Sequence, residues 1–336
     1  MARRPRPLPD SLPWKVSTAA EARAAGVLPG RLRGRDIARI DRGLYGKLDL
    51  PVGPTVADAP GPATPRSPAS LQIREEDVIR ALQRADPDAL VSGISAARLW
   101  GLPLPLEKER WDADDSETTT TMSLAGVDRS AKKRVTWRSC EITGPDRAVL
   151  REIAMTSRLR TFVDLGTSLP VDDLIAIGDH LVRTPRPSYE GRAVPYVRLD
   201  TLHAAVRSFR GRGARRLQAA VAEIRRGADS PAETTLRLAL MRAALPDAVL
   251  NGTLRADDET WLGEPDMAWP AWRVCVEYDG RHHRTAAQQA KDVQRGERRR
   301  VAGWVELIIT TADMKDGAGS AIQRVRDELR RRGWDG

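Results

Sequence analysis

A stretch of twenty residues, 51–70, limits how the chain can fold, because it cannot take part in a hydrophobic core. Its sequence, PVGPTVADAPGPATPRSPAS, holds six prolines and almost no large apolar side chain. Such a segment buries too little apolar surface to offset the entropy that it would lose on ordering. We therefore expect a Pro-rich linker at 51–70, with one folded domain before it and the rest of the fold after it.

The length and composition limit the number of domains and the class of protein. A domain takes about 100–200 residues, so two or three domains are expected in 336 residues, and 41% hydrophobic residues exclude disorder throughout. No run of about 18 apolar residues occurs, and the first residues, MARRPRPLPDSLPW, have arginine and proline where a signal peptide needs apolar side chains. We expect a cytoplasmic protein with no membrane partner.

The charge balance points to an anionic partner. Lysine and arginine number 55 against 46 aspartates and glutamates, which gives a formal net charge of +9. For a cytoplasmic protein this excess favours nucleic acid, although an arginine-rich composition can also reflect a GC-rich genome. The two cysteines, Cys140 and Cys275, are too few for a disulfide framework or an all-protein zinc site, and Cys275 lies in an apolar run typical of a buried residue.

Residues 1–50 have the order of a winged helix-turn-helix DNA-binding domain. We expect a short helix from Ser17, a turn near Gly26, a second short helix and a two-stranded wing over 37–45. In such a fold the second helix enters the major groove, with arginines of that helix and of the wing near phosphates or base edges. The predicted contacts are Arg31, Arg33, Arg35, Arg39 and Arg42. The alternative is a small helical cap whose arginines are solvated.

Residues 71–227 read as a mixed α/β domain without a catalytic cluster. Apolar spacing predicts helices at 75–84, 92–100, 157–165, 171–182 and 200–209, and strands at 120–124 and 134–138. His180 and His203 stand alone on helical patterns, which is more typical of surface or core histidines than of ligands. Five arginines between 207 and 216 fit a phosphate-binding segment or a solvated helix junction, and the junction is favoured.

The last part of the chain, 228–336, alternates helices and strands in the order αβββαβα. Ser230 is a helix cap, Pro231 suits the first helical position and Glu233 the third, so a helix is expected at 231–244. Strands are expected at 248–254, 263–269, 273–279 and 304–310, and further helices at 287–302 and 320–332. The fold class is therefore α/β, as a multidomain α+β chain.

A pair of acids in this region is the strongest chemical signal. Asp266 and Glu277 lie at equal distances from the midpoint between Ala271 and Trp272, so a hairpin with a two-residue turn would place them directly opposite each other. Opposed residues have Cβ atoms about 4.5–5.5 Å apart, where like charges repel. Strand alternation adds Asp279 to the same face. Met267, Val274 and Val276 are expected to provide apolar surroundings.

A divalent cation would offset this repulsion. Mg²⁺, or Mn²⁺ in its place, takes one or two carboxylates together with waters and phosphate oxygens, so it would also bring a phosphodiester to the site. The alternative is that Asp266 and Glu277 are strand-end charges facing water, with nearby arginines as casual partners. We favour a metal site held by Asp266 and Glu277.

The C-terminal residues resemble the PD-(D/E)xK nuclease superfamily, in particular the branch similar to very-short-patch-repair endonucleases, whose restriction-endonuclease-like core is αβββαβ. The matching text is Glu233 on the first helix, PD at 265–266, VEYDGRHH at 276–283, Asp292 with Arg295, and GWVELIITTADM at 303–314. The resemblance implies that Asp266 and Glu277 bind the metal and that Glu233 supports it through water.

This sequence departs from the motif at one place. Many members have a lysine where this chain has Asp279, so no amine is available there to orient water. His283 is the substitute that we expect to move protons, and His282 is the adjacent alternative. Lys291 and Arg295 are candidates for contacting nucleic acid, and Arg295 also has the spacing for an ion pair with Asp292.

The front of the chain has a looser resemblance. The winged-helix segment and SRLRTFVDLGTSLPVDDLIAIGDHLVR, at 157–183, resemble actinobacterial proteins in which a domain similar to AbiEi-type antitoxins precedes the nuclease-like domain. This implies DNA binding and does not establish a partner toxin.

We expect a metal-dependent DNA endonuclease that is targeted to double-stranded DNA by its winged-helix region. The alternative is a non-catalytic, antitoxin-like repressor with a degenerate nuclease fold. A structural RNA-binding protein is disfavoured, because the nine tryptophans are scattered instead of forming a base-stacking platform. The sequence leaves open whether the chain forms a homodimer.

Overall fold

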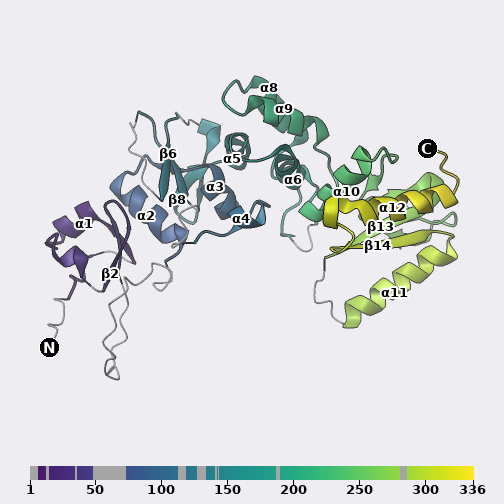
Figure 1. Ribbon diagram of the computed structural model, residues 1–336, viewed down its shortest axis with the longest axis horizontal. Helices are drawn as coiled ribbons and strands as arrows, with labels where there is room; N and C mark the ends of the chain where they lie inside the picture. The colour runs from purple at the N-terminus through teal and green to yellow at the C-terminus, as the bar shows by residue number, and fades with distance from the viewer. Residues whose placement is uncertain are drawn as a thin grey trace. The chain divides into compact units, whose positions relative to one another are not determined.

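The computed structural model describes residues 7–12, 15–34, 36–47, 73–112, 119–126, 134–140, 142, 144–186, 190–280 and 286–336, apart from the side chains of 286–290. The chain divides into two compact units, Met1–Leu165 and Gly166–Gly336. Each combines helices with β-sheet, which confirms the α/β class (Figure 1). Among the helices of the described residues, none has the length and apolar character to cross a bilayer.

The first unit begins with a small antiparallel sheet in the order β1-β3-β2, made of β1 (Val16–Thr18), β2 (Ile37–Asp41) and β3 (Leu44–Lys47). Helix α1 (Ala19–Ala24) starts at a capping box of Thr18 and Glu21. The predicted first helix and hairpin are therefore present.

The prediction of a second helix in this region is wrong. It is a single 3₁₀ turn, η1 (Arg31–Arg33), between Gly30 and Gly34. Glycines on both sides oppose helix extension, because each costs about 1 kcal/mol in a helix relative to alanine.

A second sheet in the same unit has the order β6-β5-β4-β8-β7. Its strands are β4 (Leu90–Val91), β5 (Thr120–Ser123), β6 (Val135–Arg138), β7 (Arg147–Leu150) and β8 (Ile153–Thr156). The helices are α2 (Glu75–Ala85), α3 (Gly93–Trp100), α4 (Leu106–Glu109) and α5 (Arg158–Leu165). The predicted helices and strands are confirmed, and β4, β7 and β8 are too short to have shown a periodic pattern.

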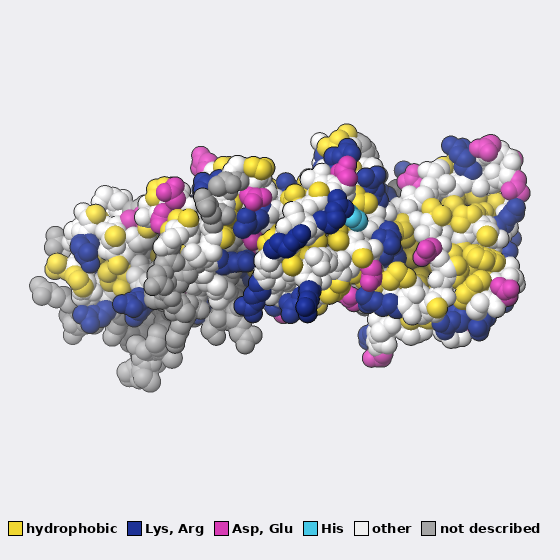
Figure 2. Space-filling model, turned by 90° about the horizontal axis from the view of Figure 1, so that it is seen from above, with side chains coloured by type: hydrophobic (Ala, Val, Ile, Leu, Met, Phe, Trp, Pro, Cys, Tyr) yellow, Lys and Arg dark blue, Asp and Glu magenta, His cyan; other side chains and the backbone are white. Residues whose placement is uncertain are grey.

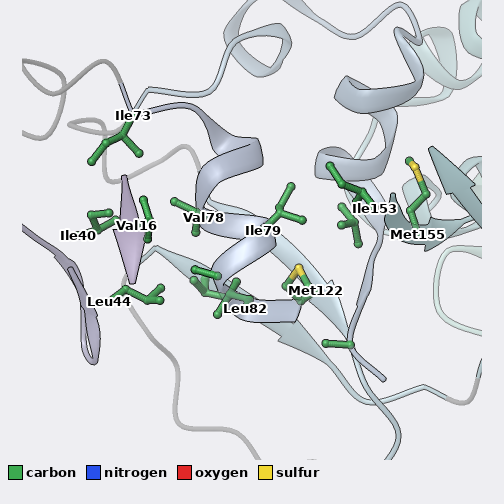
Figure 3. Packing of buried hydrophobic residues seen from close by; sticks show 14 of the residues in the cluster. Val16, Ile40, Leu44, Ile73, Val78, Ile79, Leu82, Met122, Ile153 and Met155 are labelled. Carbon is green, nitrogen blue, oxygen red and sulfur yellow. The ribbon is translucent and has the colours of Figure 1, made fainter. Parts of the chain in front are cut away.

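One hydrophobic core serves both sheets of the first unit. Val16 and Leu44 of the small sheet pack with Val78 and Ile79 of α2 and with Met122 of β5 (Figure 3). The front of the chain is thus joined to the residues that follow the predicted linker, which itself lies outside the described residues.

The second unit opens with helices α6 (Val171–Val182), α8 (Leu199–Ser208), α9 (Ala214–Glu223) and α10 (Pro231–Arg242). Its main sheet has the order β14-β13-β12-β9, from β9 (Val249–Leu250), β12 (Met267–Trp269), β13 (Val274–Asp279) and β14 (Val305–Thr310). Strands β13 and β14 are parallel and the other pairs antiparallel. A separate ribbon pairs β10 (Leu254–Arg255) with β11 (Trp261–Gly263).

Helices cover this sheet on its two faces. Helices α11 (Ala286–Val301) and α12 (Lys315–Arg331) lie on opposite sides of β13 and β14 (Figure 1). Leu236 and Leu240 of α10 pack with Val325 of α12 against Met267 and Val276. The other face holds a smaller cluster around Ala268 and Cys275.

A buried ion pair joins α6 to α10. Asp179, fully buried on α6, accepts hydrogen bonds from Arg237 Nη2 and Thr234 Oγ1 of α10, each at 2.9 Å, and from the backbone N–H of Arg225 at 2.7 Å. Breaking such a pair would leave an unpaired buried charge, so the two helices stay together. The break between the units accordingly falls after Leu165, inside the segment 71–227 that the sequence suggested as one domain.

Candidate functional site

The start of α10 fixes the position of Glu233. Ser230 caps the helix, accepting from the backbone N–H of Glu233 at 3.2 Å and donating its hydroxyl to Oε1 at 2.8 Å. The backbone N–H of Asp229 and the amide of Asn251 donate to Oε2 at 2.8 and 3.2 Å. The side chain is only 7% exposed, and burial raises the pKa of this carboxyl. The predicted cap is confirmed, and it holds Glu233 in one place.

The hairpin register is the predicted one. Met267 pairs with Val276, Ala268 with Cys275 and Trp269 with Val274, so the same register continued by one residue brings Asp266 opposite Glu277. The connection has four residues instead of two, because Pro270–Trp272 forms a 3₁₀ turn and Arg273 adopts a positive φ of 50°.

Asp266 is a half-buried carboxyl close to other acids. One of its oxygens accepts the backbone N–H of Tyr278 at 2.6 Å. Burial, followed by repulsion from Glu233 and by a smaller contribution from Glu277, raises the pKa of Asp266 to about 8. Within the described part of the chain, no arginine or lysine forms an ion pair with Asp266.

Glu277 has a different environment, because an arginine neutralises it. Arg299 of α11, fully buried, donates from Nη1 to Glu277 at 2.7 Å and lies 3.0 Å from Glu306 of β14. Its Nε donates to the carbonyl of Leu262 at 2.9 Å. Arg299 therefore offsets the repulsion at Glu277, a role that the sequence had suggested for a metal ion. Among the described residues, Asp266 and Glu233 have no arginine or lysine in an ion pair with them.

Strand alternation also corrects the apolar surroundings that the sequence predicted. Met267, Val274 and Val276 lie on the opposite face, in the core with α10 and α12. The acids share their face with Ala268 and Cys275. Cys275 is buried as expected, and burial raises the pKa of its thiol to about 12.

The donor set for a cation consists of two carboxylates. Within the described residues, no group of three or more His, Cys, Asp or Glu side chains could hold a metal ion, so Asp279 is not gathered with Asp266 and Glu277. Asp279 ends β13, where it pairs with Thr310 of β14. Mg²⁺ is commonly bound by one or two carboxylates, with waters and phosphate oxygens completing its shell, so Asp266 and Glu277 fit this ion.

The predicted nucleic-acid contacts differ in how exposed they are. Arg33, Arg39, Arg42 and Lys291 are exposed. Arg31 donates to Asp36 at 2.7 Å and is partly buried, and Arg295 forms the predicted ion pair with Asp292 at 2.8 Å. Arg35, His282 and His283 lie outside the described residues.

Arg299 is the site residue that the sequence did not reveal. It stands in a run of three arginines near the end of α11, where spacing alone does not tell which one faces the sheet.

Comparison of the chain with protein-family models, with curated proteins and with solved structures found no match.

Proposed function

We propose that the second unit hydrolyses or nicks phosphodiester bonds in double-stranded DNA with Mg²⁺ or Mn²⁺ as cofactor. The observation that carries the proposal is the unneutralised carboxyl pair of Asp266 and Glu233, in which burial and mutual repulsion raise the pKa of Asp266. Opposite Asp266, Glu277 completes a two-carboxylate set on the same sheet face. At neutral pH a pKa near 8 leaves Asp266 mostly protonated, and a divalent cation that also binds phosphate would take the place of that proton.

Each residue has a distinct task in this proposal. Asp266 and Glu277 would hold the cation, which, when bound, polarises a phosphoryl oxygen and lowers the pKa of water. The backbone N–H of Tyr278 orients the Asp266 carboxyl, and Arg299 binds one oxygen of Glu277 and leaves the second for a ligand. Glu233 and Asp279 would assist, and His283 would transfer the proton.

The front of the chain would direct the protein to DNA through the hairpin of its winged-helix-like region, without the predicted major-groove helix, because that segment is the 3₁₀ turn η1. Its hairpin of β2 and β3 carries Arg39 and Arg42, both exposed, and Arg33 is exposed on the preceding turn. Arginines on a hairpin next to a helical turn match the way a wing contacts phosphates. Arg31, engaged by Asp36, would contribute less.

The test is plasmid nicking by the full chain. Supercoiled plasmid is incubated with the protein and Mg²⁺ or Mn²⁺, and with EDTA as the metal-free control. We expect metal-dependent conversion to open circles, which Asp266→Asn abolishes and the exposed-site control Asp335→Asn retains. Circular dichroism checks that both variants fold. An unchanged rate in Asp266→Asn, or no nicking by the unaltered protein, would refute the proposed chemistry.

A non-catalytic DNA-binding repressor is the second candidate. The ion pair between Glu277 and Arg299 and the aspartate at position 279 favour it, because the first occupies a ligand oxygen and the second replaces the motif lysine. Retarded migration of a DNA duplex, without nicking in either metal, would support this function over hydrolysis.

A further inference from the structure

The turn between α8 and α9 carries a concentrated positive charge that the nuclease site does not use. Five exposed arginines lie within ten residues of sequence, Arg207, Arg210, Arg212, Arg215 and Arg216. No aspartate or glutamate occurs between Asp200 and Glu223. Figure 2 looks onto these helices and shows groups of dark blue side chains over them. We call the five side chains the α8–α9 arginine cluster.

The nearest acids in the sequence already have partners. Asp200 pairs with Arg198 at 2.7 Å, and Glu223 lies 3.9 Å from Arg242, which also pairs with Asp172. Within the described part of the chain, none of the five arginines of the cluster forms an ion pair. Protein surfaces usually intersperse both signs of charge, so five arginines without a carboxylate indicate an anionic partner.

The backbone presents this cluster rigidly. Gly213 has a φ of +95°, and a Cβ there would lie 2.5 Å from the backbone of Gly166, so the turn is packed closely against it. Leu217 of α9 packs on Gly166, and Ile224 at the end of α9 packs on Gly178 of α6. A fixed backbone lowers the entropy lost when the arginines engage a ligand.

The chemistry of the cluster matches a phosphate backbone. A guanidinium binds phosphate oxygens in a bidentate manner, and duplex DNA offers one phosphate charge per about 1.7 Å of its length. The first turn of α9 holds no acidic residue, so its free backbone N–H groups add to the positive potential. Arg210 donates to the carbonyl of Phe209 at 3.2 Å, and Arg216 makes a longer hydrogen bond, of 3.5 Å, to the carbonyl of Thr167. Arg212 and Arg215 are the more available side chains, and Arg216 is held by this long contact alone among the described residues.

We propose that the α8–α9 arginine cluster binds the phosphate backbone of double-stranded DNA and so gives the second unit a DNA contact of its own. This inference rests on the proposed function, because it takes duplex DNA as the partner. It adds a surface distinct from the predicted winged-helix arginines and from the carboxylates of the nuclease site.

The test measures the affinity of the full chain for a fluorescent duplex by anisotropy at several salt concentrations, in EDTA. The cluster variant carries Arg212→Gln, Arg215→Gln and Arg216→Gln. The matched control carries Arg198→Gln, Arg255→Gln and Arg300→Gln. These substitutions remove the same charge from three exposed arginines that are ion-paired. We expect the cluster variant to bind roughly tenfold more weakly, and its slope of log K against log salt to fall by about 0.9 for each phosphate that it no longer neutralises.

The outcomes separate the inference from the proposed function. If the unaltered protein does not bind duplex DNA, the proposed function fails. If the unaltered protein binds and the cluster variant binds equally well, the inference is overturned. If the control variant weakens binding as much as the cluster variant does, the loss reflects net charge alone, and the inference is also overturned. A weakening confined to single-stranded RNA would overturn the assignment to DNA.

Discussion

Replacing Arg299 with methionine should destabilise the second unit more than any other single arginine change on α11. Arg299 is fully buried, while the side chains of Glu277 and Glu306 that it neutralises are 18% and 20% exposed. Removing one partner of a buried pair costs about 3–5 kcal/mol, because the remaining charge is left without compensation. Both carboxylates retain some contact with water, so we expect a decrease near the lower end, about 3 kcal/mol in the free energy of unfolding.

Urea unfolding at neutral pH, followed by tryptophan fluorescence, measures this decrease. Arg300→Met is the matched control, since Arg300 is exposed and, among the described residues, its one ion pair is with Glu297 at 2.7 Å. This change should cost less than about 1 kcal/mol. Adding Glu277→Gln and Glu306→Gln to Arg299→Met removes the stranded charges and should restore much of the stability. A decrease for Arg299→Met no larger than that of the control, or no recovery in the combined variant, would refute the reasoning.

Three further predictions follow from the same structure. The pKa of Asp266 lies near 8 in the folded chain, and its ordinary value is 3.8. Between these two values the folded state binds more protons than the unfolded state, so the free energy of unfolding falls as pH rises from about 4 to about 8. Urea titrations at several pH values should show a smaller pH dependence for Asp266→Asn. A Cβ at position 178 would lie 2.1 Å from Ile224, so Gly178→Ala should lower the midpoint of thermal unfolding by overpacking, at a cost of about 1–3 kcal/mol, and Ile224→Ala in the same chain should relieve part of it. Cys275 should resist maleimide in the folded protein, because it is buried and the pKa of its thiol is near 12, whereas the partly exposed Cys140 should react; mass spectrometry after brief labelling distinguishes the two.

Local rules were sufficient for much of the second unit. The cap of Ser230, Pro231 and Glu233 fixed the start of α10, because its hydrogen bonds join residues within one turn. The equal spacing of Asp266 and Glu277 about one turn gave their register, because every pair in an antiparallel hairpin is set by its connection. The positive charge of the α8–α9 turn was also visible in the sequence. Helix α9, which follows this turn, was not predicted, although Leu217, Ala220 and Val221 recur at the spacing of one helical face.

The sequence by itself determined most of the helices and strands and which acids oppose each other, since these depend on neighbours in the chain. The exceptions are the turn η1, the helix α9 and the strand expected at 248–254, which is two short strands in different sheets. Tertiary packing decided that Arg299, and neither of its two arginine neighbours, enters the sheet face, and that Asp179 binds Arg237 across 58 residues. It also decided which apolar residues lie on the side away from the acids. These outcomes depend on which helix covers which face of a sheet, and periodicity along the chain does not encode that choice.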